Sequence, residues 1–177
     1  MNYATIKKTD VANGPGIRVS LFVSGCTHRC KGCFNSEAWD FGYGQRYTKE
    51  TEREILEALA PEYIRGLSLL GGEPMEPENR GTVLSLVKKV RQTYPGKDIW
   101  CYTGYDYEKD LLRWAERETP DESHEAQTAR LLSLIDVLVD GEFVEEKKNL
   151  RLAFRGSENQ RLIDVKESLR QGRTVCL

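Results

Sequence analysis

Three cysteines that lie close together are the residues of this chain best suited to chemistry. Cys26, Cys30 and Cys33 have the spacing C-x3-C-x2-C, which can hold three irons of a four-iron cluster and leaves the fourth without a protein ligand. Clusters that only carry electrons usually have four cysteine ligands. The other two cysteines, Cys101 and Cys176, lie far downstream, and their spacing does not suggest a ligand pair. The pattern predicts a 4Fe-4S cluster with one open coordination site.

Two other uses of the cysteines have to be weighed. His28 lies in the same loop, so a Cys3His zinc site is an alternative, although zinc ligands mostly come as two separated pairs. A disulfide framework is disfavoured, because the number of cysteines is odd, at five, and a chain of 177 residues can bury a core without crosslinks. We therefore expect reduced thiols, with His28 a loop residue rather than a ligand.

Length and composition indicate one domain that spans residues 1–177. A content of 39% hydrophobic and 31% charged residues fits a globular chain of this size. The N-terminus lacks the apolar core of a signal peptide, and no uncharged apolar run approaches the roughly 20 residues of a membrane span. The net charge is −2 with basic residues dispersed among acidic ones, which argues against binding to polymeric nucleic acid. We expect a cytoplasmic protein without a membrane partner.

The cysteine loop is expected at the end of a strand. Residues 17–23 form an apolar run with β-branched members that leads directly into this loop. A helix is expected at 48–59, with a capping-box pattern at residues 51–54 and Pro61 just beyond its end. Further along, we expect strands at 66–70, 99–103 and 135–139, helices ending at 94–96 and spanning 107–118 and 125–133, and a polar connection at 119–123.

Alternating strands and helices predict a parallel sheet covered by helices. A complete eight-fold barrel needs about 250 residues, so this chain can form only a partial, open βα barrel of about five or six mainly parallel strands with outer helices. Functional sites gather at the C-terminal ends of such strands. The cysteine loop and the segments 71–74, 104–105 and 140–141 all follow strands, so we expect them to converge on one face.

These motifs resemble a known superfamily. A C-x3-C-x2-C loop after the first expected strand and Gly-Gly-Glu-Pro at 71–74 after the second resemble the radical S-adenosylmethionine enzymes. Within that superfamily the chain is similar, over nearly its whole length, to the activating proteins of anaerobic (class III) ribonucleoside-triphosphate reductases. The supporting segments are 13–16, 21–26, 95–100, 103–105, 137–143 and 155–160. The resemblance implies a partial barrel of the radical S-adenosylmethionine type.

The resemblance also implies a reaction and a partner. S-adenosylmethionine would chelate the open iron, and an electron from the reduced cluster would break its carbon–sulfur bond. The resulting 5′-deoxyadenosyl radical would take hydrogen from a backbone glycine of the large reductase subunit and leave a glycyl radical there. Reduced flavodoxin would suit as electron donor. We expect no catalytic side chain acting as acid or base, because the cofactor carries the chemistry.

Site residues follow from this resemblance. The three cysteines would be the cluster ligands. Gly71 and Gly72 lack a β-carbon, which would let the backbone approach the methionine amine, while Glu73 either adds a carboxylate or turns the loop. The alternative for the glycine pair is a tight turn after a strand.

The residue that contacts the adenine is less defined. The superfamily often has an aromatic residue just before the third cysteine, whereas this chain has Gly32 there and Phe34 after it. We assign the adenine contact to Phe34, or to the backbone of Gly32 and Cys33.

Several motifs keep two interpretations. Residues 140–143 are either functional or a simple turn, and residues 13–16 either line a docking edge or reverse the chain. Residues 155–160 join the apolar segments 150–154 and 162–165, which is typical of a hairpin loop.

Two competing functions remain at this point. One is a metal protein that never cleaves S-adenosylmethionine. The other is a radical enzyme that acts on a small molecule, or an activator of a different glycyl radical enzyme. A small-molecule enzyme would need a closed pocket and usually a longer chain, so the short open architecture favours a protein substrate.

Overall fold

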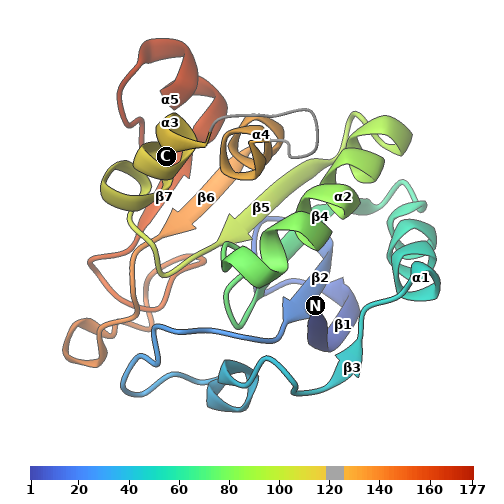
Figure 1. Ribbon diagram of the computed structural model, residues 1–177, viewed down its shortest axis with the longest axis horizontal. Coiled ribbons are helices and arrows are strands. Elements are labelled where there is room, and N and C mark those ends of the chain that lie inside the picture. Colours follow the sequence, from blue (N-terminus) through green and yellow to red (C-terminus); the bar gives the residue numbers. More distant parts are fainter. Residues whose placement is uncertain (119–125) are drawn as a thin grey trace.

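The protein is described by a computed structural model that covers residues 1–118 and 126–177. The polar connection expected at 119–123 lies outside the described residues. The strands are β1 (Asn2–Asp10), β2 (Ile17–Val23), β3 (Gln45–Arg46), β4 (Ile64–Gly71), β5 (Asp98–Tyr102), β6 (Val137–Asp140) and β7 (Arg161–Asp164). They form one sheet in the order β3-β1-β2-β4-β5-β6-β7 (Figure 1).

Five α-helices accompany the sheet in the described part of the chain. They are α1 (Lys49–Leu59), α2 (Pro77–Thr93), α3 (Leu112–Arg117), α4 (Gln127–Leu134) and α5 (Val165–Gln171). A π-turn, η2 (Tyr107–Leu111), leads into α3, and short 3-10 turns occur at η1 (Ser36–Trp39) and η3 (Glu145–Lys147). None of the described helices combines the length and apolar character needed to cross a bilayer.

The centre of the sheet is parallel and its margins are antiparallel. Strands β2, β4, β5 and β6 run parallel, whereas β1, β3 and β7 pair antiparallel with their neighbours. The prediction of a mainly parallel α/β sheet with helices is confirmed for this centre. The predicted number of five or six strands is wrong, because β1, β3 and β7 extend the sheet to seven.

Local predictions succeeded where the chain is buried. The strand predicted at 17–23 coincides with β2, and its last six residues are buried.

The capping box predicted at 51–54 is wrong, because the box lies one turn earlier. There the Thr48 hydroxyl accepts from the Thr51 amide at 3.4 Å, and the Thr51 hydroxyl accepts from the Thr48 amide at 3.2 Å.

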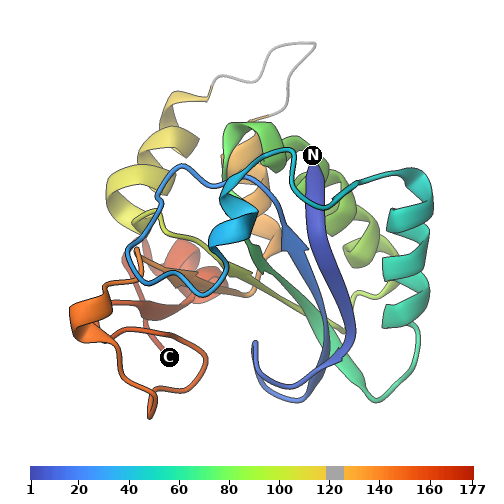
Figure 2. The same cartoon turned by 90° about the horizontal axis from the view of Figure 1, so that it is seen from below.

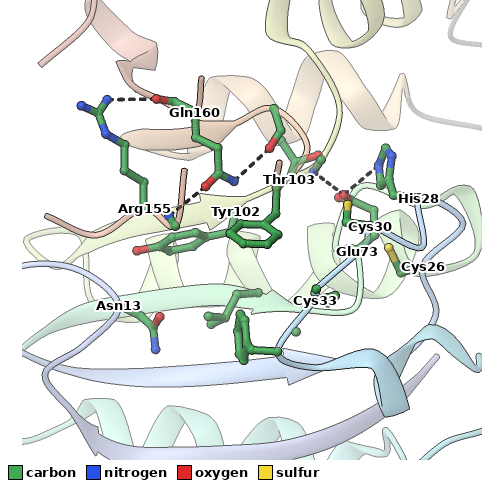
Figure 3. Close-up of a pocket in the computed structure, with 18 of the residues that line it drawn as sticks. Asn13, Cys26, His28, Cys30, Cys33, Glu73, Tyr102, Thr103, Arg155 and Gln160 are labelled. Atoms are coloured by element: carbon green, nitrogen blue, oxygen red, sulfur yellow. Dashed lines mark hydrogen bonds and ion pairs between the residues drawn. The ribbon is translucent and has the colours of Figure 1, made fainter. Parts of the chain in front are cut away.

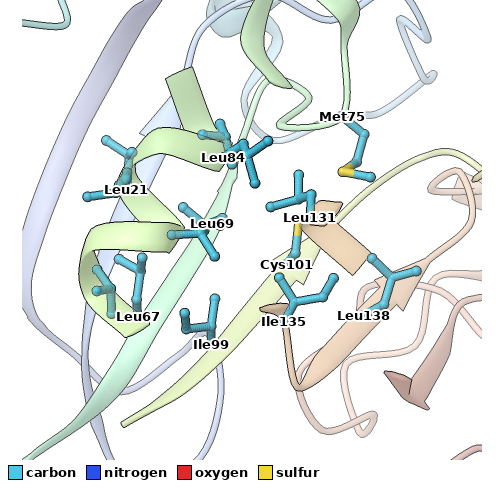
Figure 4. Close-up of a cluster of buried hydrophobic side chains, with 14 of the residues drawn as sticks. Leu21, Leu67, Leu69, Met75, Leu84, Ile99, Cys101, Leu131, Ile135 and Leu138 are labelled. Atoms are coloured by element: carbon cyan, nitrogen blue, oxygen red, sulfur yellow. The ribbon is translucent and has the colours of Figure 1, made fainter. Parts of the chain in front are cut away.

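One face of the sheet is covered by the helices and forms the main core. Leu67 and Leu69 of β4 and Ile99 and Cys101 of β5 point into this layer, fully buried, and contact apolar side chains of α2 and α4 (Figure 4). Cys101 serves there as a small buried hydrophobic residue. Alternate residues of the parallel strands therefore supply one continuous apolar layer.

The opposite face of the sheet carries polar and aromatic residues. Arg18 of β2 is fully buried there, with Ser68 of β4 and Trp100 of β5 beside it. Its guanidinium pairs with Asp98 at 2.5 Å, donates to the Ser68 hydroxyl at 2.7 Å and lies over the Trp100 ring. Loops rather than helices lie on this side in the described chain (Figure 2).

Both margins of the sheet end in short pairings. On the outer edge of β1, the two residues of β3, Gln45 and Arg46, pair with Tyr3 and Asn2. On the other margin an isolated bridge joins Ile163 of β7 to Cys176 near the C-terminus. In the described chain, most of the outer edge of β1 therefore has no strand partner, whereas β7 is bridged by the C-terminal segment.

An arginine on β7 fixes the margin near β6. Arg161 donates from Nε to Asp140 at 2.9 Å and pairs with Glu108 at 2.6 Å. The hydroxyl of Thr174, close to the C-terminus, donates to the same glutamate. These bonds lower the pKa of Glu108 to about 2, with the Arg161 hydrogen bond as the largest cause.

Arg18 provides a test of the buried ion pair. We expect Arg18→Met to lower the free energy of unfolding by about 3 kcal/mol, because it removes the fully buried guanidinium that serves Asp98, the Ser68 hydroxyl and the Leu67 carbonyl together. The matched control is Arg65→Met, which removes the exposed second partner of Asp98 and should cost less than about 1 kcal/mol. Urea unfolding of the reduced, cluster-free protein measures both. Equal losses for the two variants would contradict this role of Arg18.

Glu108 provides a test of pH dependence. Its pKa is depressed in the folded state, so its contribution to stability is complete above the ordinary value of 4.5 and is lost as pH falls toward 2. We expect Glu108→Gln to flatten the acid side of the stability curve between these values. Glu116→Gln, at an exposed position of α3, should leave the curve unchanged. Unfolding midpoints of the cluster-free protein, recorded against pH, check this, and parallel curves for wild type and Glu108→Gln would refute it.

Candidate functional site

The loops that follow the parallel strands line one open cavity of about 630 Å³. In Figure 1 the arrowheads of β5 and β6 point toward the side where the cysteine loop and residues 141–160 lie. The predicted convergence of these loops on one face is therefore observed. All predicted site residues line this cavity, namely Cys26, Cys30, Gly32, Cys33, Phe34, Gly71, Gly72 and Glu73 (Figure 3).

Backbone hydrogen bonds join the cysteine loop to the Gly-Gly-Glu-Pro loop. The Gly72 amide donates to the Val23 carbonyl at 2.7 Å, and the Glu73 amide donates to the Gly25 carbonyl at 2.8 Å. A β-carbon on Gly71, whose φ is +113°, would lie 2.6 Å from the Val23 amide nitrogen, and one on Gly72 would lie 2.5 Å from the Gly25 carbonyl oxygen. The glycine pair thus allows two loop backbones to touch, which explains its presence without a ligand.

The Glu73 carboxylate ties three loops together. It is 1% exposed, and its oxygens accept from the amides of Met75 at 2.8 Å and Gly104 at 2.7 Å. His28 Nε2 lies 3.3 Å from Oε2 in an ion pair whose geometry falls outside that of a hydrogen bond. Of the two interpretations of Glu73, the contacts favour turning and fixing the loop.

His28 connects the cysteine loop to two acidic residues. Its Nδ1 lies 2.9 Å from Glu142 Oε1, and its ring packs edge-on against Tyr105. Burial lowers the pKa of His28, but the close carboxylate of Glu73 and then that of Glu142 outweigh this and raise it to about 9. Both ring nitrogens therefore face carboxylates, and His28 joins the cysteine loop to Glu73 and Glu142.

The thiols of the cysteine loop fit a cluster better than a single zinc ion. Burial, followed by the charge of Glu73, raises the pKa of Cys26 to about 11, and burial raises that of Cys30. Among the described residues, the three thiols do not form a group whose ligand atoms all lie within 4.8 Å of one another. Zinc holds its thiolates at about 2.3 Å, which brings the sulfurs closer together than this. The wider spread suits ligands to separate irons.

Three acidic residues near β6 do bring their side-chain oxygens close enough together to hold a single metal ion. Carboxylate oxygens of Asp106, Glu108 and Asp140 lie within 4.8 Å of one another. The guanidinium of Arg161 pairs with all three, and Asp140 also accepts from the Tyr107 amide at 2.9 Å. An arginine already neutralises this group, so Asp140 holds the fold, and the turn interpretation of residues 140–143 is favoured for its side chain.

Two buried polar residues at the start of α2 were not predicted. Glu76 is 3% exposed and accepts from the amide of Thr27 at 2.7 Å, while Asn79 is 1% exposed and donates to the Ser24 carbonyl at 3.0 Å. Polar residues near the start of a helix usually indicate a solvated face. In the sequence, the only signal was that Glu76 and Asn79 follow Glu73 at intervals of three residues. Such a spacing is too common to identify a site.

Residues 141–160 form the wall opposite the cysteine loop. The predicted hairpin is wrong, because residues 150–154 form no strand and only Lys148 and Ser157 make an isolated bridge. Gln160 folds this segment instead. Its side-chain oxygen accepts from the amides of Gly156 and Ser157, and its nitrogen donates to the Gly141 carbonyl. Apolar side chains of the segment therefore face the cavity, namely Phe143, Leu150, Leu152 and Phe154.

The remaining motifs have clear positions. Residues 13–16 reverse the chain between β1 and β2, and Asn13 also lines the cavity. Phe34 is 85% exposed at the mouth of the cavity, so its ring is accessible to a bound molecule. Cys101 and Cys176 do not line the cavity, so the structure offers no fourth thiol there.

Comparisons with known proteins agree with these observations. Residues 12–163 match the protein family described as a 4Fe-4S single cluster domain. The chain is 48% identical to an anaerobic ribonucleoside-triphosphate reductase-activating protein of Vibrio cholerae, over 90% of this chain and 96% of the relative. Proteins of the same name from Escherichia coli K12 and from phage T4 are 43% and 40% identical, and the matches cover 96% and 93% of those relatives.

Cys30 provides a test of the ligand assignment. We expect Cys30→Ser to lose the cluster, because a hydroxyl is a poor iron ligand, while the domain stays folded on its separate hydrophobic core. Iron and sulfide content, the visible absorption and far-UV circular dichroism after anaerobic reconstitution measure this. The control is Cys176→Ser, which removes an exposed thiol outside the cavity and should keep the cluster. Full iron content and an unchanged spectrum in Cys30→Ser would show that the assignment is wrong.

Proposed function

The chain belongs to the family of anaerobic ribonucleoside-triphosphate reductase-activating proteins, and from this premise we propose that it activates such a reductase by forming a glycyl radical on it. One observation carries the proposal. The three thiols and the Gly-Gly-Glu-Pro loop meet in a single open cavity at the C-terminal edge of the parallel strands. An open site beside a metal centre suits a reaction on a large partner.

The donor set fits a 4Fe-4S cluster with one free iron. Cys26, Cys30 and Cys33 would each hold one iron, and the two remaining cysteines lie away from the cavity. A reduced cluster held there would supply the one electron needed to split S-adenosylmethionine into methionine and a 5′-deoxyadenosyl radical, which would take a hydrogen atom from the glycine and become 5′-deoxyadenosine. We propose reduced flavodoxin as the electron donor.

The residues of the chain would bind and orient the substrate. Gly71 and Gly72 line the cavity without side chains, so the methionine end can approach their backbone. Glu73 would act through the loops that it joins, because both of its oxygens already accept backbone amides. Gly32, Cys33 and Phe34 lie at the mouth and would contact the adenine.

The architecture supports a polypeptide substrate. The α-helices of the described chain cover one face of the sheet (Figure 2). The cavity is lined by Asn13 and, opposite, by residues of the segment 141–160. We propose that this arrangement is a partial barrel of the radical S-adenosylmethionine type, formed by a single domain. A backbone glycine of the partner would enter from the open side, and the apolar wall would limit access of water to the radical.

An anaerobic assay tests the function. The protein is reconstituted with iron and sulfide, reduced, and mixed with S-adenosylmethionine and an anaerobic ribonucleoside-triphosphate reductase. We expect 5′-deoxyadenosine and a glycyl radical EPR signal on the reductase, and neither product with the Cys30→Ser variant.

The outcomes separate the competing functions. Cleavage of S-adenosylmethionine without a glycyl signal would contradict the proposed partner but keep the radical chemistry. An absence of cleavage in a protein with full cluster content would refute the enzymatic function as a whole.

A further inference from the structure

A buried carboxylate lies against the beginning of the cysteine loop. Glu76 stands at the N-cap position of α2, yet its side chain does not cap that helix. Instead, its Oε1 accepts from both the amide of Thr27 at 2.7 Å and the hydroxyl of Thr27 at 2.6 Å. Thr27 directly follows Cys26, so this side chain fixes the backbone beside a cluster ligand.

The same turn of α2 holds the other side of that cysteine. Asn79 donates from Nδ2 to the Ser24 carbonyl at 3.0 Å and to the Glu73 carbonyl at 2.9 Å. Ser24 lies two residues before Cys26 and Thr27 one residue after it. Two buried side chains from one helix terminus therefore hold the loop on both sides of the first cysteine.

The charge of Glu76 has little to offset it. Glu76 lies at the N-terminus of α2, whose backbone dipole favours a negative charge there. Within the residues that the structure describes, no lysine, arginine or histidine forms an ion pair with it, since His28 faces Glu73 and Glu142 and Arg80 pairs with Glu118. The pKa of the nearby Tyr105 hydroxyl is raised to about 12. Burial is the largest cause, and the negative charges of Glu76 and Glu73 act in the same direction.

We propose that Glu76 is a positioning residue that fixes the cysteine loop and, through its buried negative charge, keeps the reduction potential of the bound cluster low. This inference rests on the proposed function only in assuming that the loop holds a 4Fe-4S cluster. The potential of such a cluster depends on the net charge around it, and a nearby anion disfavours the added electron. Solvent screens a charge that is 3% exposed much less than one on the surface.

A low potential has a purpose at this site. A sulfonium is difficult to reduce, so a strongly reducing cluster favours transfer of the electron to S-adenosylmethionine. Glu76 would combine two tasks in one side chain, since its hydrogen bonds hold Thr27 while its charge acts on the cluster. Asn79 would share only the first task, because it is neutral.

Two matched variants test the charge. Glu76→Gln keeps the shape and an acceptor oxygen but removes the charge, and Glu78→Gln makes the same change at an exposed position two residues further along α2. Each protein is reconstituted anaerobically, and the reduction potential of the cluster is recorded by an EPR-monitored redox titration without S-adenosylmethionine or reductase. We expect a more positive potential for Glu76→Gln and the wild-type value for Glu78→Gln. Equal potentials in all three proteins would overturn the proposal.

A second measurement applies if Glu76→Gln does not retain its cluster. Hydrogen exchange of the Thr27 amide is compared between cluster-free Glu76→Ala and Glu78→Ala. Loss of the hydrogen bond to Glu76 should speed this exchange about tenfold, and only in Glu76→Ala. Unchanged exchange would overturn the positioning role.

Failure of this inference is distinct from failure of the proposed function. A wild-type protein that holds its cluster but does not cleave S-adenosylmethionine would refute the function and leave the comparison of potentials intact.

Discussion

The candidate site depends on the direct contact between two loop backbones at the end of β2 and β4. The parallel ladder continues past both strands, with Gly72 bonded to Val23 and Glu73 bonded to Gly25. A side chain on either Gly71 or Gly72 would occupy the space of the neighbouring backbone. Because the cysteine loop begins at this contact, the geometry of the sheet fixes where the loop starts. The parallel centre of the sheet therefore supports the loop that carries the thiols.

Polar side chains extend this contact toward the rest of the site. Glu73 reaches the loop after β5, Glu76 reaches Thr27, and His28 reaches Glu142 beyond β6. Buried polar groups of this kind stabilise a single arrangement of the loops, provided that all their hydrogen-bond partners are in place. The cavity is therefore defined by hydrogen bonds between loops, whereas the hydrophobic core on the helical side supplies the stability that allows such a polar region to exist.

The sequence predicted those parts of the fold and site that local pattern determines. Strand β2 is apolar apart from Arg18 and Ser20, so it was recognised correctly. The cysteine spacing predicted a 4Fe-4S cluster, and the chain matches a family described as a 4Fe-4S single cluster domain. Strand β1 was missed because Lys7, Lys8 and Asp10 interrupt its pattern and its partner lies across a loop. The hairpin at 155–160 was wrong because the side chain of Gln160, rather than strand pairing, folds that segment. Glu76 and Asn79 could not be identified, since their partners in the cysteine loop are brought near only by the tertiary fold.

The way in which the sheet ends has a consequence for the chain before it receives iron. An unpaired strand edge is a template for adding strands from other molecules, and it promotes aggregation. Here the outer edge of β1 meets the polar pair Gln45 and Arg46, and the C-terminal segment bridges to β7 at Ile163. These pairings involve no metal ligand, so this part of the sheet margin can form before the cluster is in place.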